Sequence, residues 1–262
     1  MLPTTIDGVI ACLEDIVNQS AAAGSRLGYF AALYKRMTMA IRDGIRDGRF
    51  QDAARMERVD VAFATRYLTA REQYFAGELQ GQSWLQAYSA ATVPDYTVLQ
   101  QLLIAINPHI VIDLGVAAAR TCPGDQMAAF QTDFNTVNDV ILSLFPVVDA
   151  ELDDLSPFEN FVDHSFLGFL KNKAIDLSID AGRKSSWNFA VSLAYLDLPS
   201  QSFAIGKRDL EAVALGECIL KDPMAAIARK RESTDVRHNI EVLNGPAIAA
   251  TPRTPQTSSR QP

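Results

Sequence analysis

Residues 106–119 are the most apolar part of the chain, yet they include a histidine and an aspartate. In a helix, His109 and Asp113 are four residues apart and lie on one face. The flanking residues are mainly Ile, Val, Leu and Ala, so such a helix has no polar side for water and must be buried. An ionised carboxylate in these surroundings costs several kcal/mol unless it is paired, hydrogen-bonded or bound to a cation. The sequence therefore predicts a partner for Asp113 and a candidate site around it.

Helical periodicity extends along nearly the whole chain, and strand-like alternation is nowhere sustained. Further helices are expected from Asp52 onward and over residues 84–91, 132–152, 166–179, 182–196 and 208–231. We therefore expect an all-α fold, a single-domain helical bundle over residues 1–244 with a central buried helix that carries His109 and Asp113. Residues 245–262 lack periodicity and are expected to form a disordered C-terminal tail. The clearest apolar stripe lies between residues 25 and 47 and consists of Leu27, Phe30, Tyr34, Met37, Ile41 and Ile45.

Pro108 divides the segment at 96–119 into either one kinked helix or two helices that meet at Asn107. We favour two helices, because Asn is a good N-cap and Pro suits the first helical position. His109 would then lie in the first turn. The partial positive charge of a helix N-terminus would keep its imidazole neutral, and the free N–H groups could receive an anion.

The charge of the chain argues against two classes of partner. The net charge is −7 and the isoelectric point is near 5.0. Nucleic acids and anionic membranes require clustered Lys and Arg, so neither is expected as a partner. The only basic cluster, at residues 229–231, is followed at once by Glu232 and is interpreted as a solvated helix end.

The cysteines and the N-terminus point to a cytoplasmic protein. The three cysteines lie far apart and form no CxxC motif, so neither a disulfide framework nor a zinc ribbon is expected. The N-terminus has no secretory signal pattern. The longest apolar run is interrupted by Pro108, His109 and Asp113, so no transmembrane segment is expected. The sequence does not indicate the oligomeric state.

Several polar residues fall on or near apolar stripes of different helices, which suggests a shared polar pocket inside the bundle. One interpretation is a structural network, with Arg66 or Arg183 paired to Asp60 or Asp113. Another is a small-molecule site with His109 as acid or base. The third is a metal site. The set comprises Asp60, Arg66, His109, Asp113 and Asn138, with Asp133 and Arg183 nearby in the pattern.

Motifs with a strong mechanistic meaning are absent. The chain has no GxSxG, GxxxxGK or GxGxxG, so hydrolase elbows, P-loops and dinucleotide sites are not indicated. The HxxxD spacing of His109 and Asp113 has none of the specificity of HExxH. No cofactor is therefore expected, and a divalent metal held by His109, Asp113 and Asp60 or Asp133 remains the alternative.

Three stretches of the sequence resemble one family. They are LYKRMT at 33–38, RMERVD at 55–60 with FATRYL at 63–68, and LQQLLIAINPH at 99–109 with DLG at 113–115. In these stretches the chain is similar to the all-helical domain-of-unknown-function family 5995, from about residue 6 to residue 223. The resemblance supports the helical fold and implies no activity, because none is assigned to that family.

The leading functional hypothesis is a small-molecule enzyme of specialised metabolism that catalyses a cyclisation, isomerisation or elimination of a small, largely apolar metabolite. His109 would be the general acid or base, Asp113 would orient it, and Asp60 would complete the catalytic set. The expected substrate contacts are Arg66, Asn138, Asp133, Arg183 and Tyr34. The alternatives are a metal-dependent hydrolase and a non-catalytic helical binding module.

Overall fold

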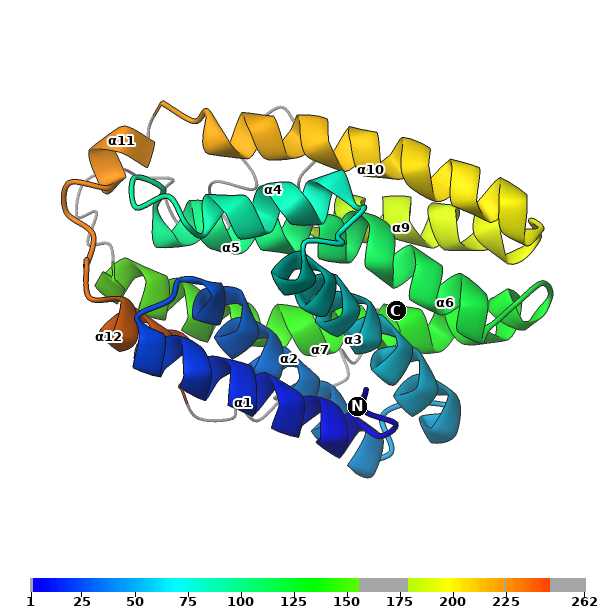
Figure 1. Ribbon diagram of the computed structural model, residues 1–262. Coiled ribbons are helices and arrows are strands. Elements are labelled where there is room, and N and C mark those ends of the chain that lie inside the picture. Colours follow the sequence, from blue (N-terminus) through cyan, green and yellow to red (C-terminus); the bar gives the residue numbers. More distant parts are fainter. Residues whose placement is uncertain (1, 156–178, 224, 246–262) are drawn as a thin grey trace, which may run out of the picture.

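The computed structural model describes residues 2–155, 179–223 and 225–245, and every regular element within them is a helix (Figure 1). The predicted all-α fold is thus confirmed. The elements are α1 (Ile6–Ala23), α2 (Leu27–Arg46), α3 (Ala53–Ala76), α4 (Gln82–Ala90), α5 (Val98–Pro108), the π-helix η1 (His109–Asp113), α6 (Leu114–Thr121), α7 (Gln126–Leu155), α9 (Ile179–Ala194), α10 (Leu198–Leu220), α11 (Ala225–Ala228) and α12 (Val236–Leu243).

Side-chain caps fix where many of these helices begin. In each case a side-chain oxygen accepts the backbone N–H three residues further on, which satisfies a donor that has no partner inside the helix. Two helices end at glycines in the left-handed conformation, Gly24 after α1 and Gly77 after α3. The N-caps are Thr5, Asp52, Thr97, Asp197 and Asp235.

The central rod of the bundle is formed by α5, η1 and α6, and the other helices cover it on several sides (Figure 1). In this view α10 lies along the upper edge next to α4 and α5, while α1 and α2 form an antiparallel pair in the lower half. Helix α3 crosses in front, and α6 packs between α3 and α9. All six residues from 114 to 119 are buried. The central helix predicted for His109 and Asp113 is therefore confirmed.

The expected break at Asn107 is wrong, because the chain stays helical from Val98 to Thr121. Instead of capping a new helix, the Asn107 side chain donates to the carbonyl of Ala212 on α10 at 2.6 Å. Pro108 cannot donate a backbone hydrogen bond, and the helix widens after it: the N–H of Leu114 bonds to the carbonyl of His109, five residues back. His109 thus lies in the middle of a helix, and no helix N-terminus is available there to receive an anion.

The same rod changes the expectation about membrane-length segments. Val98–Thr121 is long and apolar enough to cross a membrane, judged by length and composition alone. Pro108, His109 and Asp113 do not interrupt this helix, so the sequence-based reason for expecting no membrane-length segment is wrong. Within the protein, 83% of the most apolar 18-residue stretch of this helix is buried. The buried core helix of a globular bundle has the same length and apolar composition as a membrane span.

Other boundaries differ from the sequence-based expectation. The helix expected at 208–231 begins ten residues earlier, at Leu198, and ends at Leu220. The N-terminal α1 and the short α12 were not predicted. The helix expected at 166–179 lies almost entirely outside the described residues, and so does the expected tail apart from Gly245.

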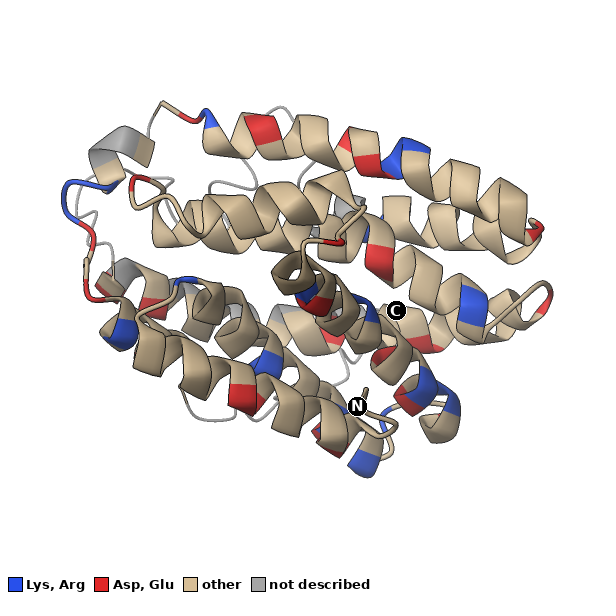
Figure 2. Ribbon diagram, in the orientation of Figure 1, with Lys and Arg blue, Asp and Glu red and all other residues tan. Residues whose placement is uncertain are grey.

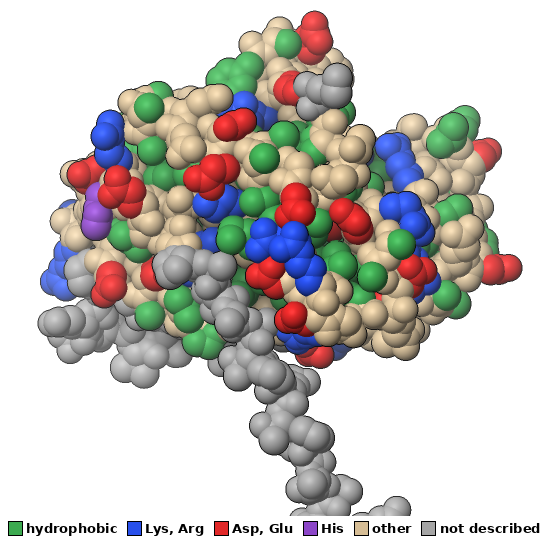
Figure 3. All heavy atoms as spheres, turned by 90° about the horizontal axis from the view of Figure 1, so that it is seen from below, with side chains coloured by type: hydrophobic (Ala, Val, Ile, Leu, Met, Phe, Trp, Pro, Cys, Tyr) green, Lys and Arg blue, Asp and Glu red, His purple; other side chains and the backbone are tan. Residues whose placement is uncertain are grey.

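Basic and acidic side chains are interspersed on the described part of the face that Figure 3 shows. Ion pairs show the same mixing of charges, since Arg46 bonds to Asp7 at 2.9 Å and Arg42 to Asp43 at 2.8 Å. The ribbon in Figure 2 likewise shows Lys and Arg close to Asp and Glu on α3 and α10. No uniformly basic patch is present on the described part of that face.

Candidate functional site

Asp113 has the partners that its burial requires. Its side chain is almost fully buried, and Nε of Arg66 on α3 donates to Oδ1 at 2.6 Å. The indole N–H of Trp84 on α4 donates to Oδ2 at 2.9 Å. These contacts join the central rod to α3 and α4. The carboxylate is thus held by one cation and one neutral donor, which is the arrangement that a buried charge needs.

His109 lies next to this carboxylate inside a box of aromatic rings. Its Nδ1 is 3.6 Å from Oδ2 of Asp113, beyond hydrogen-bond length. The imidazole stacks on Phe63 with ring centroids 3.7 Å apart and meets Tyr34 edge to face at 4.4 Å. The other rings around it belong to Phe30, Tyr67 and Trp84.

The imidazole of His109 is held in its neutral form. Burial lowers the pKa of His109, and this effect outweighs the opposing influence of Asp113. Within the described parts of the chain, neither ring nitrogen has a hydrogen-bond partner. The ring of His109 is therefore free to exchange a proton with a molecule that enters the site.

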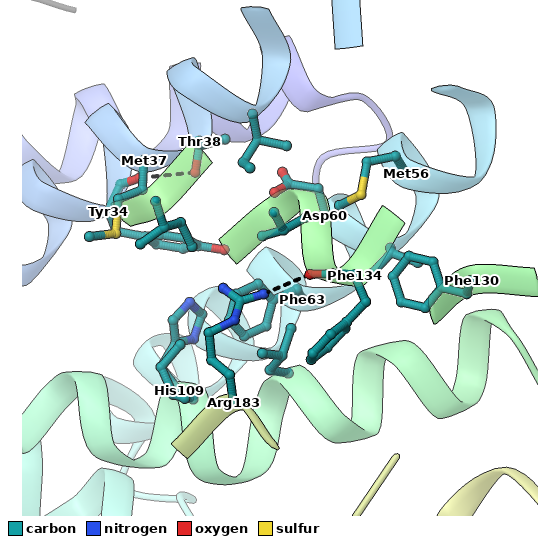
Figure 4. Close-up of a pocket in the computed structure, with 16 residues that line it drawn as sticks. Tyr34, Met37, Thr38, Met56, Asp60, Phe63, His109, Phe130, Phe134 and Arg183 are labelled. Carbon is teal, nitrogen blue, oxygen red and sulfur yellow. Dashed lines mark hydrogen bonds between the residues drawn. The ribbon is translucent and has the colours of Figure 1, made fainter. Parts of the chain in front are cut away.

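His109 also lines a small cavity with mainly apolar walls (Figure 4). The cavity measures about 50 Å³, which is room for a few water molecules. Its walls come from α2, α3, η1, α6, α7 and α9. They include the flexible side chains of Met37 and Met56 and the rings of Phe63, Phe130 and Phe134.

Asp60 is the acidic group of this cavity. It lies on α3, is 5% exposed, and has no hydrogen-bond partner for Oδ2 among the residues that the structure describes. Burial, aided by the nearby carboxylate of Glu57, raises the pKa of Asp60 to about 7. Both protonation states of Asp60 are therefore populated near neutral pH.

Tyr34 contributes a third buried polar atom to the cavity wall. Its hydroxyl makes no hydrogen bond within the described residues, and burial raises its pKa well above the usual value. The neighbouring hydroxyl of Thr38 donates to the Tyr34 carbonyl at 3.0 Å. Figure 4 shows Tyr34, Asp60 and His109 arranged around the same space.

Arg183 reaches the cavity from α9 and is 1% exposed. It donates to the carbonyl of Phe134 at 3.1 Å, drawn as a dashed line in Figure 4, and its guanidinium lies over the Phe134 ring at 5.1 Å. Asn138 belongs to α7, but its side chain is not among those that the structure describes. The expectation for Asn138 therefore lies outside the described residues.

Asp133 lies outside the cavity and has a full set of donors. Its carboxylate accepts the backbone N–H groups of Gln51 and Asp52 at 2.6 and 3.2 Å and a guanidinium N–H of Arg55 at 2.7 Å. Asp133 therefore joins α7 to the start of α3. Arg66 likewise does not line the cavity, and it meets the site only through Asp113.

The sequence-predicted residues with described side chains thus divide into three groups. Tyr34, Asp60, His109 and Arg183 line one cavity, Asp113 and Arg66 form an ion pair beside it, and Asp133 lies elsewhere. Sequence reasoning missed the donor role of Trp84, because an aromatic residue on a stripe is normally a core residue. It also missed the buried ion pair of Arg36 and Glu151, with its 2.5 Å bond.

The arrangement does not favour a metal centre. Among the described residues, no three His, Cys, Asp or Glu side chains lie close enough together to hold a metal ion. Both oxygens of Asp113 already accept hydrogen bonds from Arg66 and Trp84. The ligand set suggested by the sequence, His109 with Asp113 and Asp60, therefore has no geometric support.

Comparison with known proteins gives one match. The family model described as "Family of unknown function (DUF5995)" matches residues 6–222. This confirms the resemblance found in the sequence. No curated protein and no solved structure matches the chain.

Proposed function

The chain belongs to the family of unknown function DUF5995, and we propose from the site alone that the protein is an enzyme that moves a proton on a small, largely apolar substrate bound in the cavity. Among cyclisation, isomerisation and elimination, a cofactor-independent isomerisation requires the fewest catalytic groups. It requires one group that accepts a proton and one that returns a proton.

One observation carries this proposal: three buried polar groups face one apolar cavity, and the described residues offer them no hydrogen-bond partner there. They are the imidazole of His109, Oδ2 of Asp60 and the hydroxyl of Tyr34. Leaving a buried polar group unsatisfied costs about 1–3 kcal/mol. A ligand with one polar group and an apolar body would recover part of this cost.

The three groups suit different roles in such a reaction. His109 is the proton acceptor. Burial lowers its pKa and keeps the imidazole neutral, so a ring nitrogen is free to take a proton from the substrate. Asp60 has a pKa near 7 and can return a proton at a different substrate atom. Tyr34 stays protonated and can donate a hydrogen bond to a substrate carbonyl oxygen. The substrate loses and regains one proton, so no oxidant or reductant is required. The proton that His109 took up then passes to Asp60, directly or through water, which restores the starting state of both groups.

Asp113 acts on the reaction only through His109. Its carboxylate lies 3.6 Å from Nδ1 and would stabilise the imidazolium that forms when His109 takes a proton. We therefore assign Asp113 as a positioning residue.

The cavity must widen before a metabolite can enter, because ligand sites for such molecules are about 300–1,000 Å³. Met37 and Met56 are the wall residues best suited to move. Methionine has three rotatable side-chain bonds and adapts to irregular spaces. Substrate entry is thus expected to change the environment of these two methyl groups.

The test uses cyclopentanone in D₂O and follows exchange of its α-hydrogens by NMR. We expect the protein to accelerate exchange, and His109→Ala and Asp60→Asn to lose about 100-fold of that acceleration. The exposed residues His238 and Asp95 supply matched controls, His238→Ala and Asp95→Asn, which should behave as wild type.

Exchange that is no faster with wild type than with His109→Ala would overturn the enzymatic proposal. Methyl NMR of Met37 and Met56 distinguishes what remains. Shifts induced by cyclopentanone without exchange would identify a binding module, and unchanged methyl signals would leave the polar groups with a structural role.

A further inference from the structure

Helix α10 carries the most exposed large apolar side chains among the described residues. Phe203 is 79% exposed, Leu198 71% and Leu210 65%. Single exposed apolar residues are normal, but several on one helix mark a surface that is covered in the functional state. In Figure 1, α10 forms the upper edge of the molecule, and no described helix lies above it.

Two of these residues, Phe203 and Leu210, belong to a continuous stripe. Phe203, Gly206, Leu210 and Ala214 follow one another at three- and four-residue steps, and all four are exposed. The small residues Gly206 and Ala214 flank Leu210, so a second helix could approach closely and pack around it. We call these four residues the α10 stripe.

Charged residues beside the α10 stripe are arranged symmetrically along the helix. Lys207 is exposed and has no ion-pair partner in the described part of the chain, while Glu217 is exposed and bonds only to Lys221 of the same helix. Lys207 and Glu217 lie equally far from the point midway between Leu210 and Ala214. An antiparallel copy of α10 centred at that point would bring each Lys207 opposite a Glu217.

We propose that the α10 stripe is the docking surface for a second copy of this chain. The two α10 helices pair antiparallel about a twofold axis between Leu210 and Ala214. Leu210 packs against Ala214 of the partner subunit, and Lys207 pairs with Glu217 of the partner subunit. Each subunit contributes the same surface to the contact, so the assembly is complete with two copies and the α10 stripe is not available to a third.

The charges favour a protein partner over a lipid surface. Next to the α10 stripe stand Glu211 and Glu217 as well as Lys207 and Lys221. Anionic lipids attract surfaces rich in Lys and Arg alone. Figure 2 shows basic positions at both ends of the charged part of α10 and acidic positions between them.

The pairing is expected to be concentration-dependent. Helix α10 is about 34 Å long and about 10 Å wide. That footprint is smaller than the roughly 800 Å² per partner of a standard interface. Sedimentation velocity over a dilution series should therefore show a reversible monomer–dimer equilibrium.

The first experiment removes the apolar contact. Phe203→Asp with Leu210→Asp should shift the dissociation constant upward at least 10-fold. Phe75→Asp is the matched control, because Phe75 is 60% exposed on α3, outside the α10 stripe, and this variant should dimerise as wild type does. A wild type that is monomeric at every concentration overturns the proposal, as does a dimer that survives the double substitution.

The second experiment tests the register. Lys207→Glu and Glu217→Lys should each weaken the dimer, because each places like charges opposite one another in both halves. The two changes combined should restore it, since the pair is then reversed. No restoration in the combined variant would overturn the antiparallel arrangement. Flotation with phosphatidylcholine vesicles without dimerisation would identify a membrane surface instead.

Discussion

Nε of Arg66 donates to Oδ1 of Asp113 across 2.6 Å and so answers the demand for a partner that the apolar segment around Asp113 creates. The pair is asymmetric: the Arg66 side chain is 27% exposed, whereas the Asp113 side chain is 2% exposed. Arg66 thus keeps contact with water while it neutralises a carboxylate that has none.

Asp113→Asn is expected to destabilise the fold by about 2–4 kcal/mol, because it leaves Arg66 without its anion and removes a charge-assisted acceptor from Trp84. Urea unfolding would measure this. Arg66→Gln should be destabilising as well, and the double variant should cost less than the sum of the two. Strict additivity would show that the two residues do not act as a pair.

Asp60 should make stability depend on pH. Its pKa is about 7 in the folded protein and about 4 when unfolded, so between these values the folded state holds a proton that the unfolded chain has lost. Stability contributed by this proton is present below pH 4 and is lost as the pH rises through 7.

Asp60→Asn removes this dependence. Relative to wild type, its gain in unfolding free energy should be near zero at pH 4 and should reach about 4 kcal/mol at pH 8, at about 1.4 kcal/mol per unit of pKa shift. Asp95→Asn, at an exposed position, should show no such trend. A gain that is equal at both pH values would contradict the raised pKa of Asp60.

Glu232 is a second buried carboxyl with a pKa of about 7, raised by burial. It accepts the backbone N–H of Val98 at 2.8 Å and so caps the start of α5. Glu232→Gln keeps an acceptor and should be neutral below pH 4.5 and stabilising above pH 7. Glu232→Ala should cost about 1–2 kcal/mol at pH 5, because the N–H of Val98 loses its acceptor. Thermal unfolding of both variants under these three pH conditions would separate the outcomes.

Gly115 permits the close approach of α6 and α9. A Cβ at this position would lie 2.7 Å from a ring carbon of Phe189 and 3.2 Å from the backbone oxygen of Ser186. Gly115→Ala should therefore cost about 1–3 kcal/mol. Gly206→Ala is the matched control, since nothing lies within 4 Å of a Cβ added at that position. In dilute protein it should add about 0.5–1 kcal/mol of helix stability. Equal effects at the two glycines would contradict the close packing at Gly115.

Local sequence patterns were sufficient for most of the helices, though not for α1, and for the central role of one of them. The stripe from Leu27 to Ile45 specifies α2, because an apolar face at helical spacing is a property of adjacent turns. The same reasoning identified residues 106–119 as buried and Asp113 as a group that needs a partner. It missed α12, a helix of only 8 residues that is held by contacts with α1, α2 and α7.

The choice of partners was decided only by the tertiary structure. Asp113 and Asp133 are both almost completely buried, yet Asp113 pairs with Arg66 beside His109, while Asp133 holds the start of α3. Asn107 had the residue type of a helix cap but bonds across to α10. Periodicity determines which side of a helix is buried. Which side chains then meet depends on how the helices cross, and that is set by packing among residues far apart in the chain.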